Sequence, residues 1–251
     1  MRPITRGPSP QQQDFADYRD AFPDLVARLE PSCSFCERRI ATQLAVEHIQ
    51  PKDENRYPGL MDRWDNFLLA CVNCNSTKKD KDVRLEAFFL PDRDNTAAAF
   101  DYRPDGRVVP SKGLDHACVA RKTAENTLAL TGLDKGPAQI ADENGKIVAI
   151  DRYAQRMEVW LMAESTRGDS AFSPTVVMRR QIVKTAQATG FFSIWMRVFE
   201  DDTVMRQMLI EGYTEGETFY GFPGTARDCF DQEAQPVSPR PNCGLQRGGK
   251  I

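Results

Sequence analysis

The chain lacks the features that mark membrane and secreted proteins. Its 251 residues contain no run of about 18 apolar residues, so no transmembrane helix is expected. The opening stretch MRPITRGPSPQQQ is basic but has no apolar core of the kind that a secretory signal peptide needs. We therefore expect a cytoplasmic protein with no membrane partner.

An excess of positive charge is also missing. The sequence has 33 Lys and Arg against 36 Asp and Glu, which gives a formal net charge of -3. A protein that holds DNA alone usually presents a basic surface, because contacts with phosphates supply much of the affinity. The charge balance predicts either a local cluster of basic residues or a partner that helps to hold nucleic acid.

Cysteine is present in an odd number, seven, and four of the seven form two Cys-x-x-Cys pairs. In a chain without a secretory signal, such pairs indicate a metal site rather than disulfides. Four thiolates suit zinc in a closed tetrahedron that leaves no position for a substrate. We predict a structural zinc held by Cys33, Cys36, Cys71 and Cys74. The scattered Cys118, Cys229 and Cys243 are expected to be buried or incidental thiols.

Between and after the cysteine pairs the sequence predicts a strand, a loop, a strand and a helix. Residues 44–49 have strand character, and Pro51 ends them. Residues 52–64 are polar and suit a loop, and residues 67–70 form a short apolar strand. Residues 73–80 are polar and rich in lysine, which suits a helix that begins at the second cysteine pair.

This stretch resembles the HNH endonucleases, which carry the ββα-metal fold. The resemblance rests on the first cysteine pair, on VEHIQP, and on WDNFLLACVNCN with a lysine three residues later, and it covers about residues 31–82. It implies an α+β fold, with an N-terminal ββα-metal HNH module and a four-cysteine zinc clamp. A mostly α-helical C-terminal region is expected to follow.

The resemblance also implies roles for four polar residues. His48 matches the general base that activates water, and a neutral imidazole with a pKa of about 6.5 suits that task. Glu47 and Asn75 match the ligands of the catalytic metal, and their oxygens suit Mg²⁺ or Mn²⁺. Asn66 matches the residue that fixes the loop and orients the base. The pattern is an H-N-N variant of the family.

Basic residues beside the motif are candidates for nucleic-acid binding. Lys78, Lys79 and Lys81 follow the second metal ligand, and Arg38 and Arg39 lie in the first knuckle. They can contact phosphates, or they can belong to a solvated face. The second histidine, His116, lies outside the motif and is expected to be a surface or capping residue.

The sequence divides into four expected parts. Residues 1–92 form the HNH nuclease module with N-terminal helices, and residues 93–113 a hairpin or linker with a turn at Asp105-Gly106. Residues 114–234 form a helical domain for partner binding or oligomerisation, and residues 235–251 a flexible tail. Helices are expected over 11–20, 22–29 and 114–130, around 150–161, from Ser173-Pro174 to Gly190, over 191–199, and after a cap at Asp202.

The favoured function is a metal-dependent DNA endonuclease that hydrolyses phosphodiester bonds. The opening MRPITRG and the layout resemble HNH subunits of bacterial anti-phage systems of the Septu type, which implies an ATPase or another defence-system protein as partner. Two alternatives stay open. One is a zinc-ribbon DNA-binding or adaptor module without catalysis, in which His48 is dispensable. The other is an inactive nuclease fold kept as a regulatory subunit, and the intact Glu47-His48 pair argues against it.

Overall fold

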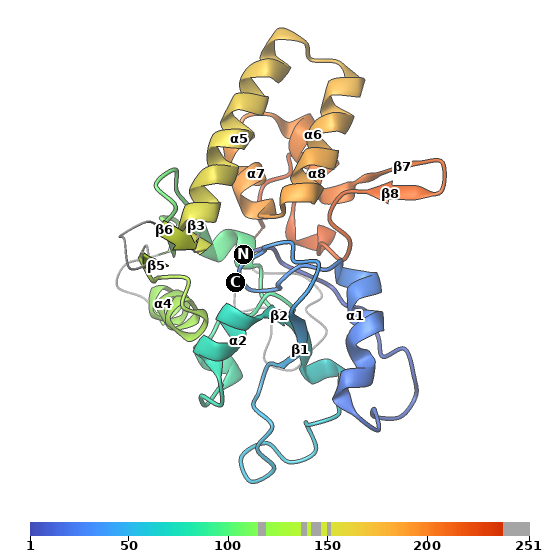
Figure 1. Ribbon diagram of the computed structural model, residues 1–251, viewed down its shortest axis with the longest axis vertical. Coiled ribbons are helices and arrows are strands. Elements are labelled where there is room, and N and C mark those ends of the chain that lie inside the picture. The colour runs from blue at the N-terminus through green and yellow to red at the C-terminus, as the bar shows by residue number, and fades with distance from the viewer. Residues whose placement is uncertain (115–118, 137–139, 142–146, 150–151, 238–251) are drawn as a thin grey trace.

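A computed structural model describes residues 1–114, 119–136, 140–141, 147–149 and 152–237. The described chain is α+β: helices are combined with small two-stranded antiparallel sheets, and the C-terminal region is mostly helical, as expected (Figure 1). The helices are α1 (Phe22–Leu29), α2 (Val72–Lys78), α3 (Thr96–Ala99), α4 (Val119–Thr131), α5 (Arg152–Phe172), α6 (Val176–Thr189), α7 (Phe192–Val198) and α8 (Thr203–Glu211). The strands are β1 (Leu44–His48), β2 (Phe67–Cys71), β3 (Phe100–Tyr102), β4 (Val108–Pro110), β5 (Ile140–Ala141), β6 (Ile147–Ala149), β7 (Tyr213–Glu215) and β8 (Thr218–Tyr220).

The N-terminal module is built on the hairpin of β1 and β2. The two strands pair antiparallel, with Glu47 opposite Leu68 and His48 opposite Phe67. Every residue of β2 is buried, because α1 and α2 pack on it from two sides (Figure 1). α2 begins directly after Cys71, so the predicted order of strand, loop, strand and helix is confirmed.

The N-terminal segment holds the turn in front of β2. The guanidinium of Arg6 donates to the carbonyl oxygens of Asp65 and Phe67 and forms a buried ion pair with Asp92 at 2.9 Å. The indole of Trp64 donates to the carbonyl of Gly7 over 2.8 Å. These contacts fix the short 3₁₀ turn η2 (Trp64–Asn66), and with it the position of Asn66.

The helical region packs on the module around one buried carboxylate. Glu37, in the first knuckle, accepts hydrogen bonds from the backbone and hydroxyl of Ser193 on α7 and from the hydroxyl of Tyr102 on β3. The amino group of Met1 lies 3.2 Å from the same carboxylate. α5 and α6 form a hairpin that projects above this junction, and α7 and α8 pack beneath it (Figure 1).

Several expected elements differ in their bounds. The expected helix over 11–20 is wrong: only η1 (Tyr18–Ala21) is helical, in 3₁₀ form, because Phe15 packs on Trp64 and donates its N–H to the carbonyl of Asp62. α6 is capped by the hydroxyl of Thr175 rather than at Ser173-Pro174. The hairpin at Asp105-Gly106 and the cap at Asp202 are confirmed.

Some predictions concern residues outside the described ranges. His116, Cys118, Cys243 and residues 238–251 of the expected tail belong to this group. Cys229 is described and is buried, as expected. Among the described helices, none combines the length and the apolar character that crossing a membrane requires.

Candidate active site

The two cysteine pairs come together in one buried cluster. Ser34, between the first two cysteines, exchanges hydrogen bonds with the backbone of Leu69, which places the first knuckle beside the middle of β2. The four sulfurs of Cys33, Cys36, Cys71 and Cys74 lie within 4.8 Å of one another.

The geometry of this cluster is compatible with zinc. The sulfurs of Cys36 and Cys71 are 3.7 Å apart. A tetrahedron with zinc–sulfur bonds of about 2.3 Å has edges of about 3.8 Å, so the observed spacing fits. Four buried thiolates leave no open coordination position, which is the donor set of a structural zinc site.

An arginine from the helical region contacts the cluster. The guanidinium of Arg152, at the start of α5, lies 3.1 Å from the sulfur of Cys74 and also donates to the carbonyls of Thr131 and Gly132. Four thiolates around a divalent ion carry a net negative charge, and a neighbouring guanidinium offsets it. The cysteine cluster therefore also joins the N-terminal module to α5.

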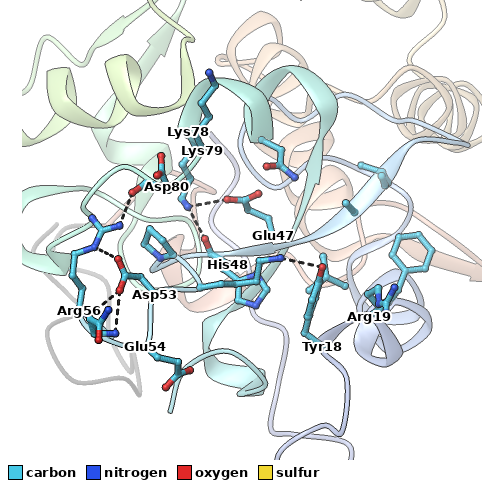
Figure 2. Close-up of a pocket in the computed structure, with 18 residues that line it drawn as sticks. Tyr18, Arg19, Glu47, His48, Asp53, Glu54, Arg56, Lys78, Lys79 and Asp80 are labelled. Atoms are coloured by element: carbon cyan, nitrogen blue, oxygen red, sulfur yellow. Dashed lines mark hydrogen bonds and ion pairs between the residues drawn. The ribbon is translucent and has the colours of Figure 1, made fainter. Parts of the chain in front are cut away.

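A cleft of about 1000 Å³ is lined by residues of β1 and α2, and the four cysteines are not among its lining residues. Its walls come from η1, β1, the loop after β1 and α2 (Figure 2). Three of the four polar residues implied by the HNH pattern line it: Glu47, His48 and Asn75. Asn66 does not line the cleft.

His48 is held in one orientation and one tautomer. Its Nε2 lies 2.7 Å from the carbonyl oxygen of Met61. Because a carbonyl only accepts, Nε2 carries the hydrogen and the neutral ring keeps a lone pair on Nδ1. The rings of Tyr18 and Phe67 pack against the imidazole in edge-on arrangements, with centroid distances to the His48 ring of 4.7 and 5.3 Å. Burial lowers the pKa of the imidazole, although the bond to Met61 opposes that shift, so the neutral form is favoured.

Glu47 and Lys78 form a buried ion pair. The Nζ of Lys78 lies 2.8 Å from Oε1 of Glu47 and donates over 2.6 Å to the carbonyl of His48. Burial raises the pKa of the Glu47 carboxyl, and the ammonium of Lys78 opposes that shift. Lys78 therefore does not lie on a solvated helix face. The ammonium of Lys78 is already paired with Glu47. Contact between Lys78 and phosphate stays a prediction.

Asn66 ties the loop after β1 to the start of β2. Its amide nitrogen donates to the carbonyls of Gln50 and Leu60, and its oxygen accepts from the N–H of Gln50. Met61, whose carbonyl binds His48, directly follows Leu60. Asn66 therefore supports the orientation of His48 through the backbone of Leu60 and Met61, and its role in orienting a catalytic base stays a prediction.

The donors around the cleft fit a hard divalent cation. Asn75 is half-buried on α2, and no hydrogen bond to its side-chain amide is present in the described chain. A carboxylate oxygen of Glu47 and the amide oxygen of Asn75 are ligands that Mg²⁺ and Mn²⁺ accept, with water or phosphate oxygens at the other positions. These two residues are the ones that would hold such an ion.

The remaining basic candidates are divided between two faces. Lys79 is exposed and lines the cleft, whereas Lys81 is exposed beyond it. Arg38 donates to Gln155 on α5 and to Asn73, and Arg39 pairs with Glu30 at 3.6 Å and donates to the carbonyl of Gln187 on α6. Both arginines thus lie towards the helical region and not on the cleft, and nucleic-acid contact by them stays a prediction.

Sequence reasoning missed several residues of the cleft. Tyr18 arrives from η1, ahead of the motif, and its hydroxyl accepts from Lys52 over 3.2 Å. Lys52 follows Pro51 directly, so its place next to the strand end could have been read from the sequence. The roles of Tyr18 and of the Met61 carbonyl depend on the folded path of the loop, and no local signal indicates them.

Comparison with known proteins identifies the module. No curated protein matches the chain. Residues 33–81 match the family model described as HNH endonuclease. The match begins at the first cysteine of the cluster and ends just after α2, so it includes β1, β2 and the residues of the cleft from Leu44 to Asp80. The chain therefore contains an HNH endonuclease domain at residues 33–81, built around a four-cysteine cluster.

Proposed function

We propose that the protein is a metal-dependent endonuclease that hydrolyses phosphodiester bonds in DNA. The main support is the fixed tautomer of His48, whose Nε2 donates to the carbonyl of Met61. Glu47 and Asn75 line the same cleft as His48. An HNH endonuclease domain suggests a nuclease and implies a DNA substrate. The cleft supplies a base and two oxygen ligands, which is what this reaction needs.

The chemistry assigned to the side chains is simple. Nδ1 of His48 accepts a proton from water as the water oxygen attacks phosphorus, and the bond from phosphorus to the 3′ oxygen breaks. Glu47 and Asn75 would hold Mg²⁺ or Mn²⁺, which would supply stabilisation of the charge on the phosphate and the leaving oxygen. Lys52 and Lys79, on the walls of the cleft, are placed to contact neighbouring phosphates.

A titration with Mg²⁺ tests the assignment of Asn75. Cleavage of supercoiled plasmid by Asn75→Ala should need at least about tenfold more Mg²⁺ than the wild type for half-maximal rate, because a ligand is lost. Ser76→Ala, a change at the next and exposed position of α2, is the matched control and should behave as wild type. An unchanged Mg²⁺ requirement in Asn75→Ala would remove Asn75 from the ligand set.

The proposal extends to the setting of the protein. Thiolate ligands are stable in a reducing compartment, so the protein would act in the cytoplasm. The layout, with a helical region after the HNH module, supports a role in defence against phage together with an ATPase or another partner. Phe172, which is 93% exposed, and Val176 and Val177 lie exposed near the end of the α5–α6 hairpin, which supports partner binding or homo-oligomerisation there.

The alternative is a zinc-ribbon module that binds DNA or acts as an adaptor. It accounts for the cysteine cluster but gives no reason for a histidine with a fixed tautomer beside a carboxylate in a cleft. The two functions differ in whether replacement of His48 changes what the protein does.

A further inference from the structure

One lysine of the cleft is withdrawn from solvent. The side chain of Lys78, the last residue of α2, is 1% exposed, and that of Glu47 is 5% exposed. The ammonium reaches Oε1 of Glu47 at 2.8 Å and the carbonyl oxygen of His48 at 2.6 Å (Figure 2). A buried ammonium is tolerated when it is paired and hydrogen-bonded, so these two contacts hold the side chain in one place.

The two contacts join the elements that carry the candidate ligands. Asn75 and Lys78 are three residues apart on α2 and therefore share a face, and both line the cleft. Glu47 and His48 are the last residues of β1. The ammonium of Lys78 thus fixes α2, which carries Asn75, relative to the end of β1, which carries Glu47.

The ion pair also orients the Glu47 carboxylate. A glutamate side chain has several rotatable bonds, and their freedom is lost only when a partner holds the group. Lys78 binds Oε1, while no hydrogen bond to Oε2 is present among the described residues. A carboxylate held by one oxygen keeps the other as an acceptor in the cleft.

We propose that Lys78 is a positioning residue of the metal site, which acts through Glu47 by holding its carboxylate in place. The inference rests on the proposed function, because it requires Glu47 and Asn75 to be the ligands. Lys78 itself is not assigned contact with the metal or with the scissile phosphate. Its loss should weaken metal binding in the same way as the loss of other outer groups that orient a ligand.

Calorimetric binding of Mn²⁺ to the full zinc-loaded chain, without nucleic acid, tests the inference. Lys78→Met should bind Mn²⁺ at least about tenfold more weakly than the wild type, while the zinc content stays unchanged. Lys122→Met is the control, because Lys122 is 72% exposed on α4 and outside the cleft. If Lys78→Met does not fold, Lys78→Gln, whose side chain is polar but shorter and uncharged, should show the same loss.

A second arm distinguishes action through Glu47 from a general structural effect. In a Glu47→Gln background, the Lys78 substitution should cause little further loss of Mn²⁺ affinity, because the group that it orients is gone. Wild-type Mn²⁺ affinity in both Lys78 variants would overturn the inference. An equal loss of Mn²⁺ affinity in the wild-type and Glu47→Gln backgrounds would overturn it too, and either result would leave the proposed function standing. A wild-type protein that binds no Mn²⁺ with its zinc site full would instead contradict the metal site of the proposed function, and the inference with it.

Discussion

At the scale of single residues, the site depends on side chains that form hydrogen bonds with backbone N–H and carbonyl groups. Asn66 uses both ends of its amide to hold Gln50 and Leu60, and Met61 then holds His48. Such a residue does no chemistry itself, but it fixes the atoms that do. Its identity as asparagine matters because it must both donate and accept.

The substitution Asn66→Asp tests this dependence. A carboxylate can still accept from the N–H of Gln50 but cannot donate to the carbonyls of Gln50 and Leu60. We expect the free energy of unfolding in urea to fall by about 1–3 kcal/mol, because buried acceptors are left unsatisfied. Asn55→Asp, at an exposed position of the same loop, should change it by no more than about 0.5 kcal/mol. Equal effects of the two changes would refute the role given to Asn66.

Elements with local signals were the ones that the sequence predicted well. The carboxylate of Asp202 accepts from the N–H of Met205, as expected of an N-cap, and α8 begins at the next residue. The start of α6 was placed too early, because Ser173-Pro174 and Thr175 are both plausible caps and only Thr175 bonds to Met178. The expected helix over 11–20 failed because contacts with Trp64 and Asp62, distant in sequence, decide its conformation.

The cap of α8 gives a prediction at this scale. Asp202 also pairs with Arg179 of α6 at 2.8 Å, so Asp202→Ala should lower the free energy of unfolding by about 1–2 kcal/mol. Asp201→Ala, at a position that is 77% exposed with an exposed partner, should have almost no effect. Urea denaturation of the wild type, Asp202→Ala and Asp201→Ala in parallel measures the three free energies of unfolding. A larger loss of stability in Asp201→Ala than in Asp202→Ala would contradict the role given to Asp202.

The effect of Asp202 should depend on pH in a defined direction. Burial raises the pKa of this carboxyl, but the bonds from Arg179 and from the helix N-terminus outweigh it, so the net pKa is lowered. A lowered pKa in the folded state means that the stabilisation is present above the unfolded pKa of about 3.9 and is lost as the pH falls through the folded value. The difference between wild type and Asp202→Ala should therefore shrink below about pH 4.

At the scale of the whole molecule, the cysteine cluster joins the parts. It connects the first knuckle to β2 and α2, and Arg152 brings α5 to the sulfur of Cys74. The spacing of the cysteines predicted the cluster, and the family pattern named three of the residues that line the cleft, Glu47, His48 and Asn75. Arg152, Tyr18 and Met61 were not predicted, because tertiary packing brings them to these sites from outside the motif or across a loop.

Removal of the metal should therefore affect more than one part. Cys71→Ser should lose the bound zinc and unfold at a markedly lower temperature, because the binding energy of a structural zinc contributes to folding. Cys229→Ser, at a buried cysteine outside the cluster, should keep one zinc per chain. Elemental analysis and thermal denaturation by circular dichroism measure both. Zinc retained in Cys71→Ser would show that the cluster is not the zinc site.

The most direct test of the account is cleavage of plasmid DNA with Mg²⁺ or Mn²⁺ by the wild type and by His48→Ala, with the zinc content of both proteins measured. We expect cleavage that requires the added metal and falls by about 10²–10⁴-fold in the variant, with zinc retained, because only the base is lost. Cleavage by His48→Ala at the wild-type rate would contradict the assignment of His48 and favour a site or a function other than the one proposed.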